Sequence, residues 1–212
     1  MMKKAMLFLL LVVFGLSVRA QTTVPLSKEE SQKLTEILTK TAADMQTMQC
    51  RFVQEKTSAM LTEPSVSEGI MHYAAPDKMR WEYTTPYSFA LVVNGERIVK
   101  VTDGQPEVLD GKSNRMYQGM VGLIMGSATG KNLFDASTFD VTLYDDDAFW
   151  KAEMTPKRRD MKRMFSRMVF RFDKKTNGIS HVEFVEAGGD SSSIRFEDIH
   201  INETIDPTVF AE

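Results

Sequence analysis

The stretch from Cys50 to Val101 constrains the fold most, because apolar and polar residues alternate along its successive segments, such as CRFVQE at 50–55 and MRWEY at 79–83. Alternation with a period of two residues is typical of strands that bury one face. Turn signals separate the segments at Ala75-Pro76-Asp77, Thr85-Pro86 and Asn94-Gly95. Asn94-Gly95 is predicted to supply the positive-φ pair of a tight hairpin. The stretch therefore predicts at least four antiparallel strands with one apolar face.

The first twenty residues have the parts of a secretory signal. Lys3 and Lys4 precede the apolar run AMLFLLLVVFGL, and small or modest residues at 17–20 occupy the positions that a signal peptidase reads. The run is shorter than the ~20 residues that a membrane-spanning helix needs. We expect cleavage after Ala20, a mature chain that begins at Gln21, and a soluble protein outside the cytoplasm. An uncleaved membrane anchor is the alternative.

Charge and cysteine content limit the partners and the means of stabilisation. Of the 26 Lys and Arg residues, three precede the expected cleavage position, so the mature chain carries 23 against 29 acidic residues. A negative chain argues against nucleic acid as a partner, and the run KRRDMKR at 157–163 is predicted to be a solvated hairpin tip. Cys50 is the sole cysteine, which excludes an intrachain disulfide. The fold must be stabilised by its core.

Helical spacing occurs in two places. Residues 27–46 predict one amphipathic helix, with Ser27 as its cap and Glu30 as the capping-box partner. The insertion at about 113–132 gathers methionines and other apolar residues between glycines and predicts short helices; methionine suits a mobile surface, and ordinary gap filling is the alternative. Strands resume at Phe139. The count is about nine to eleven strands in one mainly β (α+β) domain over 21–212, a curved antiparallel sheet whose concave face the helices fill.

Several motifs carry a resemblance to a known family. They are F-x-Q at Phe52 and Gln54, G-x-M-x-Y at 69–73, P-x-x-M-R-W-x-Y at 76–83, L-V-V-N-G-E at 91–96, MTPK at 154–157, and the hairpins MVFRFD and GISHVEFVEAGGDSSSIRFEDIHIN. Together they resemble the periplasmic outer-membrane lipoprotein carrier family, LolA, over nearly the whole mature chain. The resemblance implies an unclosed β-barrel with a helical lid over a hydrophobic cavity.

The resemblance also implies a function and partners. Such carriers take the acyl chains of lipoproteins from the inner membrane to the outer membrane. The expected location is the periplasm. The expected partners are acylated lipoproteins, an inner-membrane lipoprotein-releasing ABC transporter and, if one exists, an outer-membrane acceptor, with the carrier itself a monomer. The same architecture could instead serve a binding module for another amphiphile, such as a glycolipid or pigment precursor, or assist assembly of an envelope component.

Covering acyl chains requires an apolar wall, because each buried methylene contributes ~0.8 kcal/mol. The predicted wall residues are Phe52, Met71, Tyr73, Met79, Trp81, Tyr83, Phe89, Leu91 and Val93. The predicted lid residues are Met120, Leu123 and Ile124. A closed core against the N-terminal helix is the alternative for the wall. A carboxylate in place of Met79 is expected to leave the fold largely intact and to block the acyl chains.

The residue that holds the lid closed in many members of the family is absent from its usual position. Many relatives place an arginine immediately before the first hairpin proline, where it holds the lid, whereas this chain has Ala75. Strand alternation predicts that Arg80 points away from the wall, which makes it a poor substitute. Lid closure is therefore expected to depend on apolar contact.

Motifs for catalysis or metal binding are weak. His72, His181 and His200 lack the spacing of metal ligands, and GSATGKN at 126–132 falls short of a phosphate-binding loop. Asp145-Asp146-Asp147 lacks the further acids of a calcium loop and is predicted to be a solvated turn. The chain has no G-x-S-x-G motif. We therefore expect no catalytic residues, no metal and no cofactor, and a protein that is not an enzyme.

Overall fold

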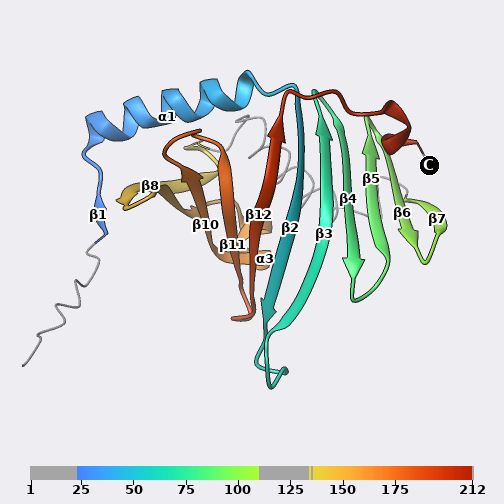
Figure 1. Cartoon of the computed structure of the whole chain (residues 1–212). Coiled ribbons are helices and arrows are strands. Elements are labelled where there is room, and N and C mark those ends of the chain that lie inside the picture. Colours follow the sequence, from blue (N-terminus) through green and yellow to red (C-terminus); the bar gives the residue numbers. More distant parts are fainter. Residues whose placement is uncertain (1–22, 110–133, 135, 212) are drawn as a thin grey trace, which may run out of the picture.

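The computed structural model describes residues 23–109, 134 and 136–211. Within them, twelve strands form one antiparallel sheet in the order β1-β8-β9-β10-β11-β12-β2-β3-β4-β5-β6-β7 (Figure 1). The strands are β1 (Val24–Pro25), β2 (Thr47–Thr57), β3 (Ser65–Ala74), β4 (Lys78–Thr85), β5 (Phe89–Asn94), β6 (Arg97–Thr102), β7 (Gln105–Leu109), β8 (Phe139–Asp146), β9 (Phe149–Pro156), β10 (Phe165–Asp173), β11 (Ile179–Glu186) and β12 (Ser191–Ile201). The helices are α1 (Lys28–Ala43), α3 (Arg159–Met164) and the 3-10 helix η1 (Pro207–Phe210).

The sheet consists of two meanders that meet in the middle. Strands β2 to β7 follow one another as neighbours, as do β8 to β12, and the pairing of β12 with β2 joins the two series. With β1 paired to β8 at one edge and β7 at the other, the sheet is a curled, unclosed antiparallel structure. The fold class expected from the sequence is confirmed. None of the helices among the described residues is long and apolar enough to cross a bilayer.

Helix α1 lies across one end of the strands (Figure 1). Its start has the predicted capping box, in which the Ser27 hydroxyl accepts from the Glu30 backbone N–H and the Glu30 carboxylate accepts from the Ser27 backbone N–H. Leu34, Leu38 and Ala42 form its buried face. The helix ends at Ala43, short of the predicted 46, because the chain must turn into β2; the Asn202 side chain accepts there from the backbone N–H of Gln46.

Several sequence predictions differ from the structure in detail. The sheet has twelve strands among the described residues, one more than the predicted maximum of eleven. Strand β1 has only two residues, so the sequence shows no alternation there that would reveal it. At the β5–β6 turn only Gly95 has a positive φ, +63°, so the predicted positive-φ pair Asn94-Gly95 is wrong; Asn94 is the last strand residue and pairs with Arg97. The charged residues of the 157–163 run are exposed as predicted, yet part of the run forms helix α3 between β9 and β10, and Met161 packs against the inner cluster.

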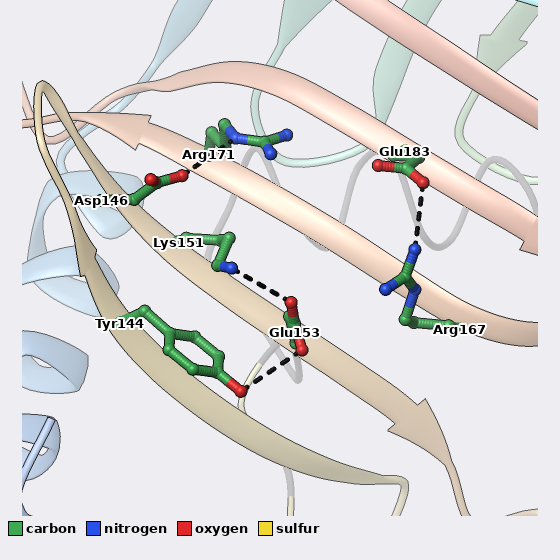
Figure 2. Close-up of polar contacts among 7 residues, drawn as sticks. All are labelled: Tyr144, Asp146, Lys151, Glu153, Arg167, Arg171 and Glu183. Carbon is green, nitrogen blue, oxygen red and sulfur yellow. Dashed lines mark hydrogen bonds and ion pairs between the residues drawn. The ribbon is translucent and has the colours of Figure 1, made fainter. Parts of the chain in front are cut away.

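The two faces of the sheet differ in chemistry. One face, called the inner face below, carries an apolar cluster that extends from β2 to β12 and includes Leu34 and Leu38 of α1. The opposite, outer face of β8 to β11 carries ion pairs, with Asp146 on Arg171, Lys151 on Glu153 and Arg167 on Glu183 (Figure 2). These long side chains surround Val169, which is only 3% exposed. The inner face is therefore the one suited to an apolar ligand.

Candidate functional site

The nine predicted wall residues lie together on the inner face of β2 to β5. Cross-strand pairs connect them, including Met71 with Trp81, Trp81 with Leu91, and Tyr73 with Met79. Seven are at most 4% exposed, and the half-buried Tyr83 and Phe89 pack against the same cluster. In this conformation the wall is a closed core. Contact of these residues with cargo stays a prediction, and the predicted lid residues Met120, Leu123 and Ile124 lie outside the described residues, as does the expected signal peptide.

An aromatic group forms the centre of the wall. Phe52 stacks on Trp81 with ring centroids 4.2 Å apart, and Tyr83 meets Phe52 edge-on at 5.2 Å. Such pairs contribute beyond the area that they bury. Gly69 makes this packing feasible, because a Cβ there would lie 1.9 Å from the Glu82 carbonyl oxygen and 2.4 Å from Cζ of Phe52. The glycine of the G-x-M-x-Y motif therefore has a steric role beneath the wall.

Three polar side chains, called the polar cluster below, border the aromatic group. They are Gln54 of β2, Tyr83 of β4 and Ser192 of β12. The Tyr83 hydroxyl donates to Oε1 of Gln54 at 2.5 Å, and Nε2 of Gln54 donates to Oγ of Ser192 at 3.4 Å. Burial raises the pKa of Tyr83 to about 12, so its hydroxyl remains a donor at neutral pH. The sequence motif includes Gln54, but nothing local in the sequence indicates its partner Ser192, 138 residues away.

Cys50 gives a direct test of how tightly the inner face is closed. Its thiol is 2% exposed, and burial raises its pKa to about 12. The reactive form is the thiolate, so we expect the native protein at pH 8 to resist a thiol reagent such as dithionitrobenzoate, whereas the protein in guanidinium chloride reacts stoichiometrically. Rapid stoichiometric reaction of the native protein would show that the inner face opens freely in solution.

The remaining candidate residues lie away from the wall. Burial, followed by the nearby Arg80, lowers the pKa of His72, and His200 pairs through Nδ1 with Glu203 at 3.0 Å. Arg80 pairs with Glu82 at 2.7 Å, on the face opposite Met79 and Trp81, as strand alternation predicts. No group of three or more metal-ligating side chains occurs among the residues that the structure describes.

Two hollows border the inner face. A groove of about 590 Å³ lies between α1 and β8, where Phe139 and Leu143 contribute to its floor. A second hollow of about 390 Å³ lies between β11 and β12, with Met48 and Phe196 among its lining residues. Both share residues with the inner cluster, so each is an opening at its margin.

Two solved structures support the fold at low sequence identity, each with a TM-score of 0.52. An uncharacterized conserved protein from Thermus thermophilus is 9% identical with a TM-score of 0.52, over 85% of this chain and 92% of that one. In the complex of Pseudomonas aeruginosa MucA/MucB, the matching chain is 11% identical with a TM-score of 0.52, over 86% of this chain and 61% of that one. A LolA superfamily protein from Nitrosomonas europaea is 11% identical with a TM-score of 0.46, over 85% and 97%.

Identities in this range show the fold alone, and a comparison with curated proteins gave no significant match. The family comparison is more decisive. The model of the family described as outer membrane lipoprotein carrier protein LolA matches residues 43–212, from the end of α1 to the C-terminus. This range includes β2 to β12, the whole wall and the polar cluster. The chain therefore belongs to the LolA family of outer membrane lipoprotein carrier proteins.

Proposed function

We propose that this protein binds the acyl chains of lipoproteins on the inner face of its sheet and carries them through the periplasm from the inner to the outer membrane. The observation that carries the proposal is the family match over residues 43–212, which contains every predicted wall residue. In this role the protein would catalyse no reaction. Its side chains exclude water from the alkyl chains, and each methylene so covered contributes ~0.8 kcal/mol.

Loading requires the inner face to open. The buried wall residues belong to one apolar cluster with residues of α1 and of β8 to β12, so acyl chains must replace contacts within this core. Four methionines of the cluster, Met48, Met71, Met79 and Met154, suit such exchange, because the unbranched thioether chain repacks at small cost. Apolar contacts with cargo then substitute for apolar contacts within the protein.

The proposal includes export, with cleavage after Ala20, and action as a monomer. It also includes as partners acylated lipoproteins, a lipoprotein-releasing ABC transporter in the inner membrane and, if one exists, an acceptor at the outer membrane. The outer face of β8 to β11, with its paired charges, has no role in holding alkyl chains.

A rival function uses the same architecture for a different cargo or for a protein partner. The similarity to the chain in the MucA/MucB complex supports it, because that fold relative was solved with a bound protein. The rival predicts that a glycolipid, pigment precursor or envelope protein accompanies the chain from its native envelope. Mass spectrometry of the co-purified material distinguishes the two functions.

The test uses two neighbours on β5 that face opposite ways. Leu91 lies in the inner cluster and is 1% exposed, whereas Val92 is 2% exposed in a small outer cluster with Val99. We expect Leu91→Ser and Val92→Ser both to lose stability, by about 2–4 kcal/mol. Only Leu91→Ser should lower the release of lipoprotein from inner-membrane vesicles, several-fold below wild type at equal concentrations of folded protein.

Two results would contradict the proposal in different ways. If the wild-type protein releases no lipoprotein from vesicles that contain the transporter, the carrier function is wrong. If both variants release equally, the carrier function stands and the inner face of β5 is not the binding wall.

A further inference from the structure

A slit, called the β11–β12 slit below, opens in the wall of the curled sheet. The pairing of β11 with β12 extends from Val185 and Ser191 only as far as His181 and Arg195. Beyond Arg195, the rest of β12 is paired with β2 alone among the described strands. The resulting cavity of about 390 Å³ is within the range of small-molecule sites. Its apolar lining consists of Met45, Met48, Ile179, Phe196, Ile199 and Ile201.

A β-bulge in β12 gives the slit its apolar lining. Glu197 pairs with Arg51, but His200 pairs with Gln49, so one extra residue stands between them, and Asp198 there has a φ of +50°. The shift places Ile201 opposite Met48, on the inner face; without it, His200 would take that position. Ile199 and Ile201 are nevertheless 37% exposed, because the slit leaves them open to solvent.

The floor of the slit is continuous with the binding wall. Met45, Met48, Ile179 and Phe196 belong to the inner cluster, and Phe196 meets the Trp81 ring edge-on at 6.2 Å. The slit is therefore a side opening of the interior and not a separate surface pocket.

The rim of the slit disfavours an anionic head group. Asp173, Asp198 and Lys175 line it, which gives two carboxylates against one ammonium. Asp173 accepts from the backbone N–H of Lys175 in its own turn, and Asp198 lies 3.7 Å from Arg51. An uncharged alkyl end suits this rim better than a carboxylate or phosphate, which the two acids would repel.

The polar cluster lies toward the opposite end of the same face. Strand β2 runs from the α1 end of the sheet, with Met48 in the slit, to Gln54 six residues later (Figure 1). At about 3.3 Å per residue this separation is roughly 20 Å. One acyl chain spans about 15 Å, half of the ~30 Å hydrocarbon core of a bilayer. The distance therefore accommodates one extended chain.

We propose that an acyl chain lies along the inner face with its carbonyl end at the polar cluster and its methyl end in the β11–β12 slit. The inference rests on the proposed function and specifies the ligand as a long-chain acyl ester or amide. At the carbonyl end, Nε2 of Gln54 has two hydrogens and makes one long bond to Ser192, which leaves a donor for the carbonyl oxygen.

Photo-crosslinking with two monopalmitoylglycerol probes tests the orientation on the unmodified mature protein. One probe carries a diazirine at the methyl end, and the other carries it beside the carbonyl. We expect mass spectrometry to find the first attached within 178–180 or 196–201, and the second within 52–56, 83–87 or 191–194.

Every other result of the crosslinking experiment would contradict a specific part of the proposal. If each probe labels the segments expected for the other, the proposed orientation is wrong. The carbonyl end would then lie near the Tyr73 hydroxyl, which is buried without a partner among the described residues. Labels from both probes confined to the wall would exclude the slit while leaving the carrier function intact. The absence of saturable binding of either probe would overturn the proposed function and this inference together.

A bulky side chain at the slit gives a second test. It compares how affinity depends on the length of the acyl chain, so it does not require the variants to be equally stable. In the wild type, affinity for monoacylglycerols should rise roughly fourfold per methylene from ten to sixteen carbons. Ile201→Trp fills the slit, so this rise should stop several carbons earlier while affinity for the ten-carbon chain is kept. Val66→Trp, at an aliphatic residue that is 51% exposed outside the slit and the inner cluster, should follow the wild type. Parallel curves for all three proteins would contradict the inference.

Discussion

Gly69→Ala is expected to lower the free energy of unfolding by about 3 kcal/mol or more. The added Cβ would lie 1.9 Å from the carbonyl oxygen of Glu82, and backbone of a paired strand cannot move aside as a flexible side chain can. It would also displace Phe52, and with it the stack on Trp81. Urea unfolding followed by tryptophan fluorescence measures the loss, and a weakened near-ultraviolet dichroism should report the disturbed aromatic group.

The matched control is Gly188→Ala. A Cβ at Gly188, in the turn between β11 and β12, meets no atom within 4 Å. That variant should unfold within about 0.5 kcal/mol of the wild type, or slightly later, because alanine restricts the unfolded chain. Equal stability of the two variants would show that β3 and β4 separate easily at Gly69, contrary to the tight packing described above.

Met79→Glu is expected to lower stability by about 3–5 kcal/mol at neutral pH. The sequence suggests that the fold tolerates this change, but Met79 is 1% exposed in the closed inner cluster, which leaves a carboxylate there without water. Met79→Leu, which keeps the volume, should cost less than about 1.5 kcal/mol. Loss of cargo by Met79→Glu would therefore reflect unfolding, and the Leu91 and Val92 pair is the sounder test of binding.

The pH dependence of the Met79→Glu variant follows from the same burial. An apolar site raises the pKa of a carboxyl, so the folded state binds its proton more tightly than the unfolded state, whose pKa is about 4.3. The difference in stability from Met79→Leu should therefore be smallest near pH 4 and grow as pH rises above the unfolded pKa. Urea unfolding of both variants between pH 4 and pH 7.5 checks this sign, and a constant difference would mean that the side chain reaches solvent.

The wall and the meander around it could be predicted from the sequence, because they depend on local order. In β2 to β5 the alternation of side chains fixes which residues share a face, and short hairpins make consecutive strands neighbours. Met79, Trp81 and Tyr83 therefore lie on one face with Leu91 and Val93 beside them, as expected. The capping box of α1 is similarly local, since it involves residues three apart.

The tertiary structure alone decided the features that depend on distant registers. The pairing of β12 with β2 places Ser192 beside Gln54, and the bulge before His200 turns Ile201 inward. The early separation of β12 from β11 opens the slit. The partner strand and register of β12 have no signal at short range, because a register between remote strands is selected by the packing of the whole inner face rather than by either segment. The bulge is the exception, since the apolar positions shift from Ile194 and Phe196 to Ile199 and Ile201 across two polar residues. The sequence therefore determined which side chains form the wall, and the assembled sheet determined where that wall is polar and where it opens.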